Sequence, residues 1–344
     1  MSNITLKTIM APTIKDIANE TGFSYATVSR ALNNKYGVKP ATRDRVKAVA
    51  QARRYSPNAL ARGLVKKQSY TIGLIIPDIS NPFFPQVARG VEDGARAKGY
   101  SVFLCNTNYE SAQEARYLKL LVEKRVDGII LTSGFQASAP SDALPAETIP
   151  MVSLCTLSEN VKNSFVVIDN ERGGFIATKH LIEQGYSTIG FIGAKNVDHS
   201  ESQRCRGYRQ ALKKFNIPFN ADFVFSGDLK RETGYGIIKR IIAEQNFPRA
   251  FFVENDLMAL GVIQGIKDSG LRVPDDIAVV GFDDIAFAAF PEISLTTVRQ
   301  PKYEMGKLAA DILLDCIING TQEPKRYILE PELVIRTSSG APLQ

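Results

Sequence analysis

The segment TIKDIANETGFSYATVSRALNN, residues 13–34, holds two short helical patterns separated by a turn. Thr13 is a candidate N-cap for the first pattern, and Ser24 is the candidate N-cap for a second helix over Tyr25–Leu32. Gly22 lies between the two patterns, where a tight turn needs a residue that tolerates a positive φ. Two short helices joined in this way are typical of a helix-turn-helix, so the segment predicts a small all-α unit.

The second of these helices is expected to have a packed face and an exposed face. Val28, Ala31 and Leu32 form its apolar face, and a third helix over residues 41–53 completes a small core. In a helix-turn-helix the second helix lies in the major groove, with its first residues near the base edges. Arg30 can make a bidentate pair with guanine there. The candidate DNA contacts of this helix and its cap are Ser24, Tyr25, Ala26, Thr27, Ser29 and Arg30.

Charge is distributed unevenly along the 344 residues, which together carry a formal charge of +6. Residues 1–69 hold 13 Lys and Arg against three Asp and Glu, a charge of +10, so the remaining 275 residues carry −4. A basic first segment on a mildly acidic body indicates that the first segment binds nucleic acid. The alternative is a merely basic, soluble tail, and the helical periodicity of the same residues argues against it.

From residue 70 onward, short apolar runs alternate with amphipathic stretches. This alternation predicts an α/β fold with parallel sheets and right-handed crossovers. A weak echo between TIGLI at 71–75 and TIGFI at 188–192 indicates two similar subdomains, with a ligand in the cleft between them. The predicted strands are 71–76, 101–106, 128–132, 151–154, 165–168, 188–192, 223–225, 250–253, 277–281 and 296–298, and the predicted helices include 84–98, 113–124, 173–184 and 203–215.

The first segment resembles the DNA-binding end of lactose/galactose-repressor (LacI/GalR) family regulators. The strings that carry the resemblance are residues 13–34, VKPATRDRV at 38–46 and YSPNALARGL at 55–64. The resemblance implies a hinge helix that folds on the operator and wedges Leu64 into the minor groove, with Asn58 and Ala61 beside it. An ordinary buried leucine in a linker helix is the alternative for Leu64. The remaining DNA contacts that we expect are Thr13, Asn34 and Tyr55.

The body resembles the effector-binding core of the same family. The matching strings are PDISNPFF, VDGIILTSG, VVIDNERGG, RCRGY, ENDLMALGV, VVGFDD and LTTVRQP. The resemblance implies a periplasmic-binding-protein-like core that dimerises through its first subdomain and crosses between subdomains near residues 169–171, 299–301 and 330–332. The effector contacts implied are Ser80, Phe84, Asp169, Arg204, Asn255 and Asp283. An arginine, two aspartates and an asparagine beside an aromatic wall suit a sugar or a similarly polyhydroxylated molecule.

Each polar effector contact also has an ordinary structural explanation. Asp283 and Asn255 can serve turn chemistry at strand ends, and Arg204 can form a surface ion pair on a helix. Glu254 departs from the family pattern, which more often has a small residue there. It either adds a negative charge near the cleft or lies outside it. Phe287 and Phe290 are more simply explained as core or cover than as pocket lining.

The composition excludes several other classes of protein. No run approaches the length of a membrane span, and Cys105, Cys155, Cys205 and Cys316 lie far apart, as in free thiols of a reducing cytoplasm. With two histidines and no GxGxxG, GxxxxGK[ST], GxSxG or HExxH, we expect no enzyme, no cofactor and no metal site. The alternatives are an α/β enzyme and a soluble sugar-binding protein, but neither explains the basic first segment.

The sequence therefore predicts a cytoplasmic, sequence-specific DNA-binding regulator, most simply a repressor, controlled by a sugar-like effector. It is expected to act on double-stranded operator DNA as a homodimer, with a higher oligomer left open. The expected parts are a disordered extension over 1–12, a helix-turn-helix domain over 13–56, a hinge helix and linker over 57–69, and an effector-binding core over 70–344, whose N-subdomain is about 70–169 and 301–330 and whose C-subdomain is about 171–299 and 332–344.

Overall fold

The computed structural model describes residues 12–55, 68–132, 149–155, 164–194, 202–245, 247–321 and 323–340. The chain divides into two compact units, Met1–Ser69 and Tyr70–Gln344. The predicted extension before Pro12 and the predicted hinge residues Asn58, Ala61 and Leu64 lie outside the described residues.

The first unit is built from three helices, α1 (Ile14–Thr21), α2 (Tyr25–Leu32) and α3 (Pro40–Ala52). Thr13 caps α1 in a capping box, because its hydroxyl accepts from the Asp16 N–H at 3.4 Å while its own N–H donates to the Asp16 carboxylate at 2.7 Å. The predicted helix over Tyr25–Leu32 is confirmed, and α3 begins one residue earlier than predicted, at Pro40. Proline suits that first helical position because it needs no N–H donor there.

The three helices share one small apolar core. Arg53 of α3 and Glu20 of α1 add an ion pair at 2.5 Å on the surface. With side chains this exposed, such a pair contributes little, so the packing of apolar faces holds the unit together. The buried core residues are Ile17, Val28, Ala31, Val46 and Ala50.

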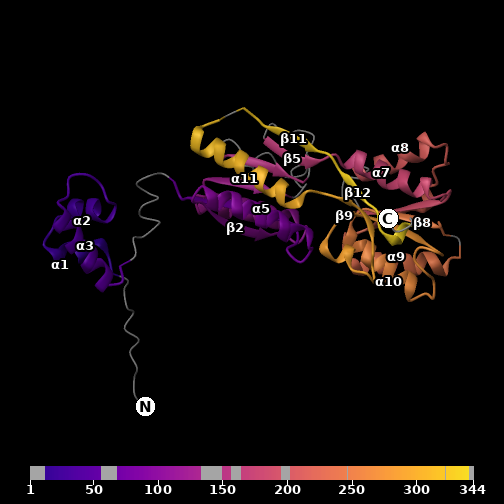
Figure 1. Cartoon of the computed structure of the whole chain (residues 1–344), viewed down its shortest axis with the longest axis horizontal. Coiled ribbons are helices and arrows are strands. Elements are labelled where there is room, and N and C mark those ends of the chain that lie inside the picture. Colours follow the sequence, from indigo (N-terminus) through magenta and orange to yellow (C-terminus); the bar gives the residue numbers. More distant parts are fainter. Residues whose placement is uncertain are drawn as a thin grey trace, which may run out of the picture. The chain divides into compact units, whose positions relative to one another are not determined.

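The second unit contains two six-stranded sheets, each with helices on both faces (Figure 1). We call the parts built on them the first lobe and the second lobe. The first sheet has the order β11-β5-β4-β3-β1-β2, and the second has the order β12-β10-β9-β8-β6-β7. The first sheet consists of β1 (Thr71–Ile76), β2 (Ser101–Asn106), β3 (Gly128–Leu131), β4 (Met151–Leu154), β5 (Ser164–Ile168) and β11 (Arg326–Leu329). The second consists of β6 (Ile189–Ala194), β7 (Val224–Gly227), β8 (Ala250–Val253), β9 (Ala278–Asp283), β10 (Thr296–Arg299) and β12 (Glu332–Val334).

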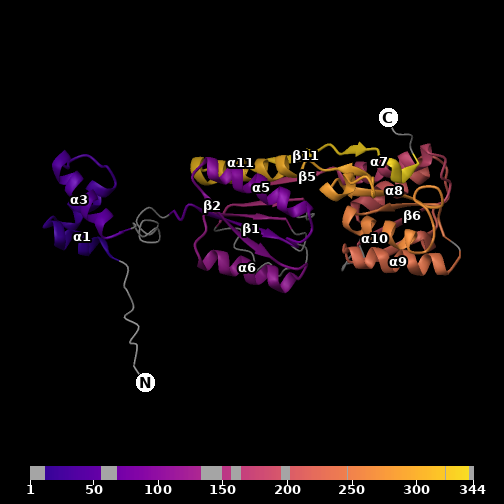
Figure 2. The same cartoon turned by 60° about the horizontal axis from the view of Figure 1, so that its bottom comes forward.

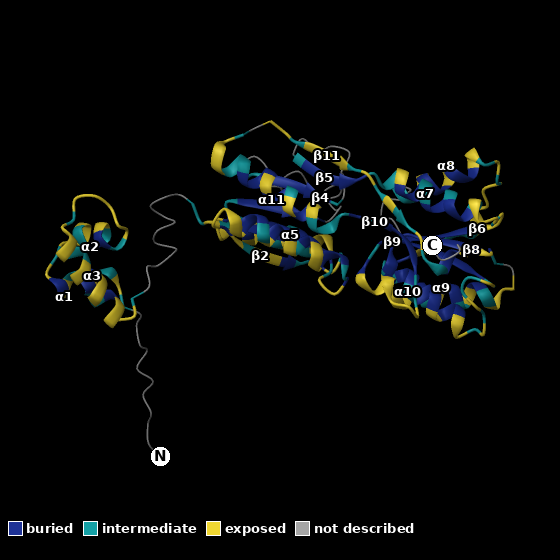
Figure 3. Cartoon of the chain, in the orientation of Figure 1, coloured by how far each residue is buried: buried dark blue, intermediate teal, exposed yellow. Residues whose placement is uncertain are grey.

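Helices cover each sheet from both sides. In the first lobe, α5 and α11 lie on one face and α6 on the other, and in the second lobe α7 and α8 lie opposite α9 and α10 (Figure 2). The central strands are buried on both faces, which explains their continuous apolar runs (Figure 3). These helices are α5 (Phe83–Ala97), α6 (Ser111–Glu123), α7 (Asn170–Glu183), α8 (Gln203–Lys214), α9 (Arg231–Ala243), α10 (Asp256–Lys267) and α11 (Lys302–Asn319), and short 3-10 turns are η3 (Ala221–Phe223), η4 (Ala286–Ala289) and η5 (Thr337–Ser339).

The two sheets repeat one strand order, and the predicted α/β fold with parallel sheets is confirmed. β1 and β6, which hold the TIGLI and TIGFI echo, occupy equivalent places in their sheets. One departure is β12, which pairs antiparallel with β10, whereas β11 pairs parallel with β5. The chain passes between the sheets after β5, after β10 and after β11.

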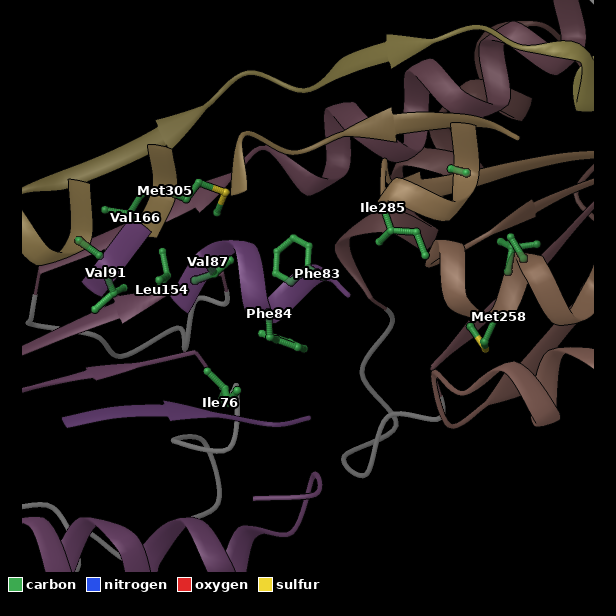
Figure 4. Close-up of a cluster of buried hydrophobic side chains, with 14 of the residues drawn as sticks. Ile76, Phe83, Phe84, Val87, Val91, Leu154, Val166, Met258, Ile285 and Met305 are labelled. Carbon is green, nitrogen blue, oxygen red and sulfur yellow. The ribbon is translucent and has the colours of Figure 1, made fainter. Parts of the chain in front are cut away.

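A single apolar cluster joins the two lobes. It includes Phe83 and Phe84 at the start of α5 together with Ile285 and Met258 of the second lobe (Figure 4). The rings of Phe83 and Phe84 meet edge to face, with centroids 5.0 Å apart. The lobes therefore share one apolar cluster, to which the start of α5, α10 and the start of η4 (Ala286–Ala289) contribute.

Candidate DNA-binding and effector sites

The exposed face of α2 carries the predicted base-reading side chains. The Tyr25 side chain is 56% exposed, and Ala26 and Arg30 are exposed as well. The guanidinium of Arg30 makes no hydrogen bond or ion pair with the described residues, and it lies near the backbone of Gly37, where an added Cβ would stand 3.8 Å from Nη1. An arginine without a protein partner on a groove-sized helix is available for a nucleic-acid base.

Among the other described contacts predicted for the first unit, Thr13, Ser24 and Tyr55 have structural roles of their own. Ser24 caps α2 by accepting from the Thr27 N–H at 3.2 Å. Tyr55 is half-buried against the core of the unit. Asn34 is exposed at a positive φ of 53°, and Ser29 is half-buried on α2. Thr13 and Ser24 thus place the starts of the helices, and their hydroxyls are partly used within the protein.

Tyr36 is an exposed aromatic residue that sequence reasoning missed. Its side chain is 99% exposed in the turn between α2 and α3, and it is flanked by Lys35 and Gly37, whose φ is 88°. Aromatic residues next to lysine in a polar turn give no periodic signal, so only the exposure identifies it.

A pocket of about 450 Å³ is lined by residues of both lobes. The loops after β1, β2 and β7 and the start of α10 form its wall, at the carboxyl ends of parallel strands, where ligands of such folds bind. Of the six predicted effector contacts, only Ser80 lines this pocket. Its lining residues are Asp78, Ser80, Asn108, Tyr109, Lys230, Arg231, Glu232 and Leu257.

Arg204, near the start of α8, is held by groups from three neighbouring segments. Its Nε donates to Asn170 Oδ1 at 2.8 Å, and its Nη1 donates to the carbonyl oxygen of Glu254. Nη1 lies 3.9 Å from the Asp283 carboxylate, and the guanidinium stacks 3.7 Å from the Phe282 ring centroid. The sequence left open that Arg204 forms an ordinary ion pair on the helix surface. The structure differs from that alternative, because the Arg204 side chain is only 17% exposed.

Asp283 ends β9 in a strained backbone conformation. Its φ is 118° and that of Asp284 is 52°, in the region that side chains other than glycine rarely adopt. Such strain concentrates at functional sites. Burial raises the pKa of Asp283 to about 6, although the charge of Arg204 and a 2.7 Å hydrogen bond from Gln300 lower it. The structure thus brings the predicted residues Arg204 and Asp283 together.

The charge of Asp283 reaches residues of the first lobe. Burial is the main cause that raises the pKa of Tyr109, to about 12, and the charge of Asp283 adds to it. Burial likewise raises the pKa of Cys155, which follows β4, with Asp283 adding to the shift and Arg204 opposing it. Asp283 therefore lies within electrostatic range of two first-lobe side chains that sequence reasoning did not select, and one of them, Tyr109, lines the pocket.

The other predicted effector contacts are engaged locally. Asn255 caps α10, because its Oδ1 accepts from Met258 N–H at 2.9 Å and its Nδ2 donates to the Leu229 carbonyl at 3.0 Å. These bonds are the turn contacts at a strand end that the sequence offered as the alternative role of Asn255. Asp169 caps α7 through the Arg172 N–H at 2.9 Å. The Ser80 hydroxyl donates to Asp78 at 2.6 Å, and Phe84 is buried in the apolar cluster between the lobes.

Basic residues at the end of β10, at the start of α11 and after β12 clamp the strained end of β9. Lys302 donates to the carbonyl oxygens of Asp283 at 2.5 Å and Asp284 at 2.8 Å. Arg299 binds the Asp284 carboxylate at 2.8 Å, and Arg336 binds it at 2.7 Å. Although burial opposes the shift, hydrogen bonds from these two arginines hold the pKa of Asp284 below its ordinary value. The sequence offered RQP only as a landmark, so the clamp was not foreseen.

No helix in the described part of the chain combines the length and hydropathy that a bilayer crossing requires.

Two exposed aromatic residues, Phe287 and Phe290, pack edge to face at 41% and 48% exposure. They cover the surface around η4 and do not line the pocket described above.

Both units match known protein families. Residues 13–58 match bacterial regulatory proteins of the lacI family, and residues 178–339 match a periplasmic binding protein-like domain. The HTH-type transcriptional repressor PurR of Aliivibrio salmonicida is 35% identical over 327 residues, which cover 95% of this chain and 98% of that protein. Identity at this level over nearly the whole of both chains shows common family membership.

Solved structures agree with this assignment. The lac repressor dimer bound to operator and the anti-inducer ONPF has a TM-score of 0.83 at 29% identity, covering 96% of this chain and 99% of that chain. The complex of the transcriptional regulator CelR with cellobiose has a TM-score of 0.71 at 30% identity and covers 95% and 99%. The chain belongs to the LacI family of bacterial regulatory proteins, as its sequence motifs indicated, and it is a DNA-binding transcriptional repressor and not an enzyme.

Proposed function

We propose that this repressor is controlled by a sugar or sugar derivative that binds between the two lobes. The observation that carries the proposal is the pairing of Arg204 with the strained, buried Asp283 at the carboxyl end of β9. A carboxylate and a guanidinium in one site offer both acceptors and donors to hydroxyl groups. Binding of cellobiose by the related regulator CelR supports the same ligand class.

The effector is proposed to act by favouring one arrangement of the lobes. The clamp from Lys302 ties Asp283 to the segment that leads into α11, so a ligand at Asp283 acts on a connection between the lobes. An effector alters operator affinity only if it binds the two states of the repressor unequally, and operator DNA must then alter effector affinity by the same factor. The proposed effector contacts are Ser80, Phe84, Asp169, Arg204, Asn255 and Asp283.

The first unit is proposed to read operator DNA through α2, with Arg30 on a guanine. The absence of a protein partner for Arg30 among the described residues supports this role, as does the charge of +10 over residues 1–69. We propose residues 13–56 as the DNA-binding domain, 57–69 as hinge and linker, and 70–344 as the effector core. The proposed DNA contacts are Thr13, Ser24, Tyr25, Ala26, Thr27, Ser29, Arg30, Asn34, Tyr55, Asn58, Ala61 and Leu64.

A homodimer formed through the first lobe is the proposed assembly. β2 is the edge strand of the first sheet, and its Phe103 and Leu104 side chains are 55% and 42% exposed. Ile79, in the loop after β1, is 44% exposed. Apolar side chains on an edge strand favour association with another surface, and a second copy of this chain is the partner proposed here. Sedimentation equilibrium tests this, since Phe103→Asp should shift the protein from dimer to monomer and a monomeric wild type would refute it.

Thermal unfolding of the full chain with candidate effectors tests the proposed ligand class. A ligand that binds the folded state raises the unfolding temperature by mass action. We expect at least one unphosphorylated sugar, drawn from a set that includes D-glucose, D-ribose and cellobiose, to raise it in a concentration-dependent way. The same sugar should change the operator affinity of wild type but not that of an Asp283→Asn variant. Stabilisation by nucleobases alone would contradict the sugar assignment.

A further inference from the structure

We infer that Glu254 is a specificity-determining residue that makes the effector site reject phosphorylated and other anionic ligands. This inference rests on the proposed function, because it assigns a charge preference to the site between the lobes. Glu254 directly follows β8, at the carboxyl end of a central strand of the second sheet. Glu254 contacts Arg204, one of the proposed effector contacts, through its backbone carbonyl.

Glu254 is fixed at the carboxyl end of the second sheet. Its side chain is 7% exposed, and Oε2 accepts the N–H of Ala194 at the end of β6, the neighbouring strand. Gly193 provides the room for this carboxylate, because a Cβ there would stand 2.5 Å from Oε2. The other carboxylate oxygen, Oε1, makes no hydrogen bond with the described residues. The carboxylate is therefore held in place by one oxygen and keeps the second as an acceptor.

Glu254 belongs to the same electrostatic site as Arg204 and Asp283. Its backbone carbonyl accepts from the Arg204 guanidinium, and its charge adds to the causes that raise the pKa of Asp283. Acidic residues also follow or end the adjacent strands, with Asp228 after β7 and Asp284 after β9. The carboxyl edge of this sheet thus carries a row of carboxylates.

Four of the described cations around this row are already used within the protein. Arg204 binds Asn170, Glu254 and Asp283 and covers the Phe282 ring, as described above. Lys302 donates to two backbone carbonyls, and Arg299 and Arg336 share the Asp284 carboxylate. The pocket lining adds two basic and two acidic side chains, so it supplies no surplus of positive charge.

An anionic group placed beside Glu254 would face a carboxylate that forms no ion pair with the described residues. Two unit charges roughly 6 Å apart, in a medium with an effective dielectric constant of roughly 20, repel enough to weaken binding by about 100-fold. Hydroxyl or ammonium groups instead donate to Glu254 Oε1 and Asp283. The chemistry of the site therefore selects neutral, hydroxyl-rich ligands and tolerates amino sugars.

Paired probes that share one ring and differ in charge test this inference. The dissociation constants of the full-length repressor are measured by calorimetry for D-glucose, D-glucose 6-phosphate and D-glucosamine, and for D-ribose with D-ribose 5-phosphate. For any sugar that binds, the phosphate ester should bind about 100-fold more weakly, and the amino sugar at least as tightly as its parent. Phosphate esters that bind as tightly as their parents would overturn the inference while leaving the proposed sugar site intact.

The Glu254→Gln variant tests whether Glu254 causes the weaker binding of phosphate esters. Glutamine keeps an oxygen for the Ala194 N–H and removes only the charge. The dissociation constant of the phosphate ester divided by that of the parent sugar should therefore fall by at least about tenfold. Glu244→Gln, at the exposed end of α9, is the matched control and should leave the ratio unchanged. An unchanged ratio in Glu254→Gln would overturn the assignment.

Two further outcomes remain decisive. If Glu254→Gln unfolds, Glu254→Ala removes the same charge and should lower the ratio between the dissociation constants of ester and parent, whereas an unaltered ratio would again refute the inference. If wild type binds no probe of either charge, the proposed sugar site itself fails, and the inference fails with it. That result differs from one in which sugars bind without charge discrimination.

Discussion

Arg30 and Arg204 are the two arginines on which the proposed DNA site and the proposed effector site depend, and their surroundings differ. Arg30 is exposed on α2 and makes no hydrogen bond or ion pair with the described residues, whereas Arg204 is 17% exposed and bound by Asn170, Glu254 and Asp283. A side chain in water loses little when it binds DNA. A side chain held by protein groups must exchange contacts when a ligand arrives. The effector site is therefore part of the core's stability, and the DNA-reading surface is not.

Substitution of Arg204 tests this contrast most strongly. Arg204→Ala removes the cation beside a buried carboxylate, and loss of one partner of a buried pair costs about 3 to 5 kcal/mol. We expect a loss toward the lower end of that range, because the Asp283 pKa is already raised and protonation can relieve part of the cost. Urea unfolding of the full chain measures the change, and effector response should be lost as well.

The control for Arg204 is the double variant with Asp283→Asn. Once the carboxylate is neutral, loss of the arginine should cost clearly less, because no buried charge is left without a partner. Equal losses in both backgrounds would mean that Arg204 stabilises the lobe through its hydrogen bonds and its packing on Phe282, and not through the charge of Asp283. The double-mutant cycle thus separates the ion pair from the other contacts of Arg204.

Arg30→Ala should leave stability unchanged and damage recognition. Loss of a bidentate guanine contact costs about 1 to 3 kcal/mol of specific binding and relaxes one base position. Binding-site selection from random duplexes with wild type and variant measures both effects. An unchanged base preference would remove Arg30 from base reading, and a lower unfolding temperature would break the contrast with Arg204.

The sequence predicted the architecture well because periodicity and strand–helix alternation are local signals. The helix over Tyr25–Leu32, the strand Thr71–Ile76 and the capping residues Thr13 and Ser24 were all correctly predicted. β11 and β12 were not predicted, since short edge strands with exposed residues lack a clear apolar pattern.

The sequence predicted less of the effector site. It selected Arg204 and Asp283, which do lie together, but not Lys302, whose bonds to two carbonyls depend on the tertiary fold. It also left open whether Glu254 lies near the cleft or outside it, because a departure from a family motif carries no geometry. Contacts between residues distant in the chain are beyond what periodicity can give.

The pH dependence of stability gives a smaller test of the buried site. The pKa of Asp283 is about 6 in the folded protein, above its ordinary value of 3.8, so folding favours the protonated carboxyl. Its contribution is present at low pH, falls as the pH rises from about 4 to about 6, and is lost above that range. When the pH is lowered from 7 to 5, the free energy of unfolding of wild type should rise by about 1 kcal/mol relative to that of Asp283→Asn. Urea unfolding at both pH values measures this, and a gain on raising the pH would reverse the assigned sign.

The smallest expected effect belongs to Tyr36, which is 99% exposed in the turn after α2. Next to Lys35, its phenol is placed to donate to a DNA phosphate, and loss of one such hydrogen bond costs about 1 kcal/mol or less. Tyr36→Phe should therefore weaken binding a few-fold and equally for all duplex sequences, since a phosphate contact carries no base information. The unfolding temperature should not change, because the ring contacts so little of the protein. A change in base preference would instead place Tyr36 beside Arg30 among the base-reading residues. A change in stability alone would mean that exposure is a poor guide to DNA contact in the first unit.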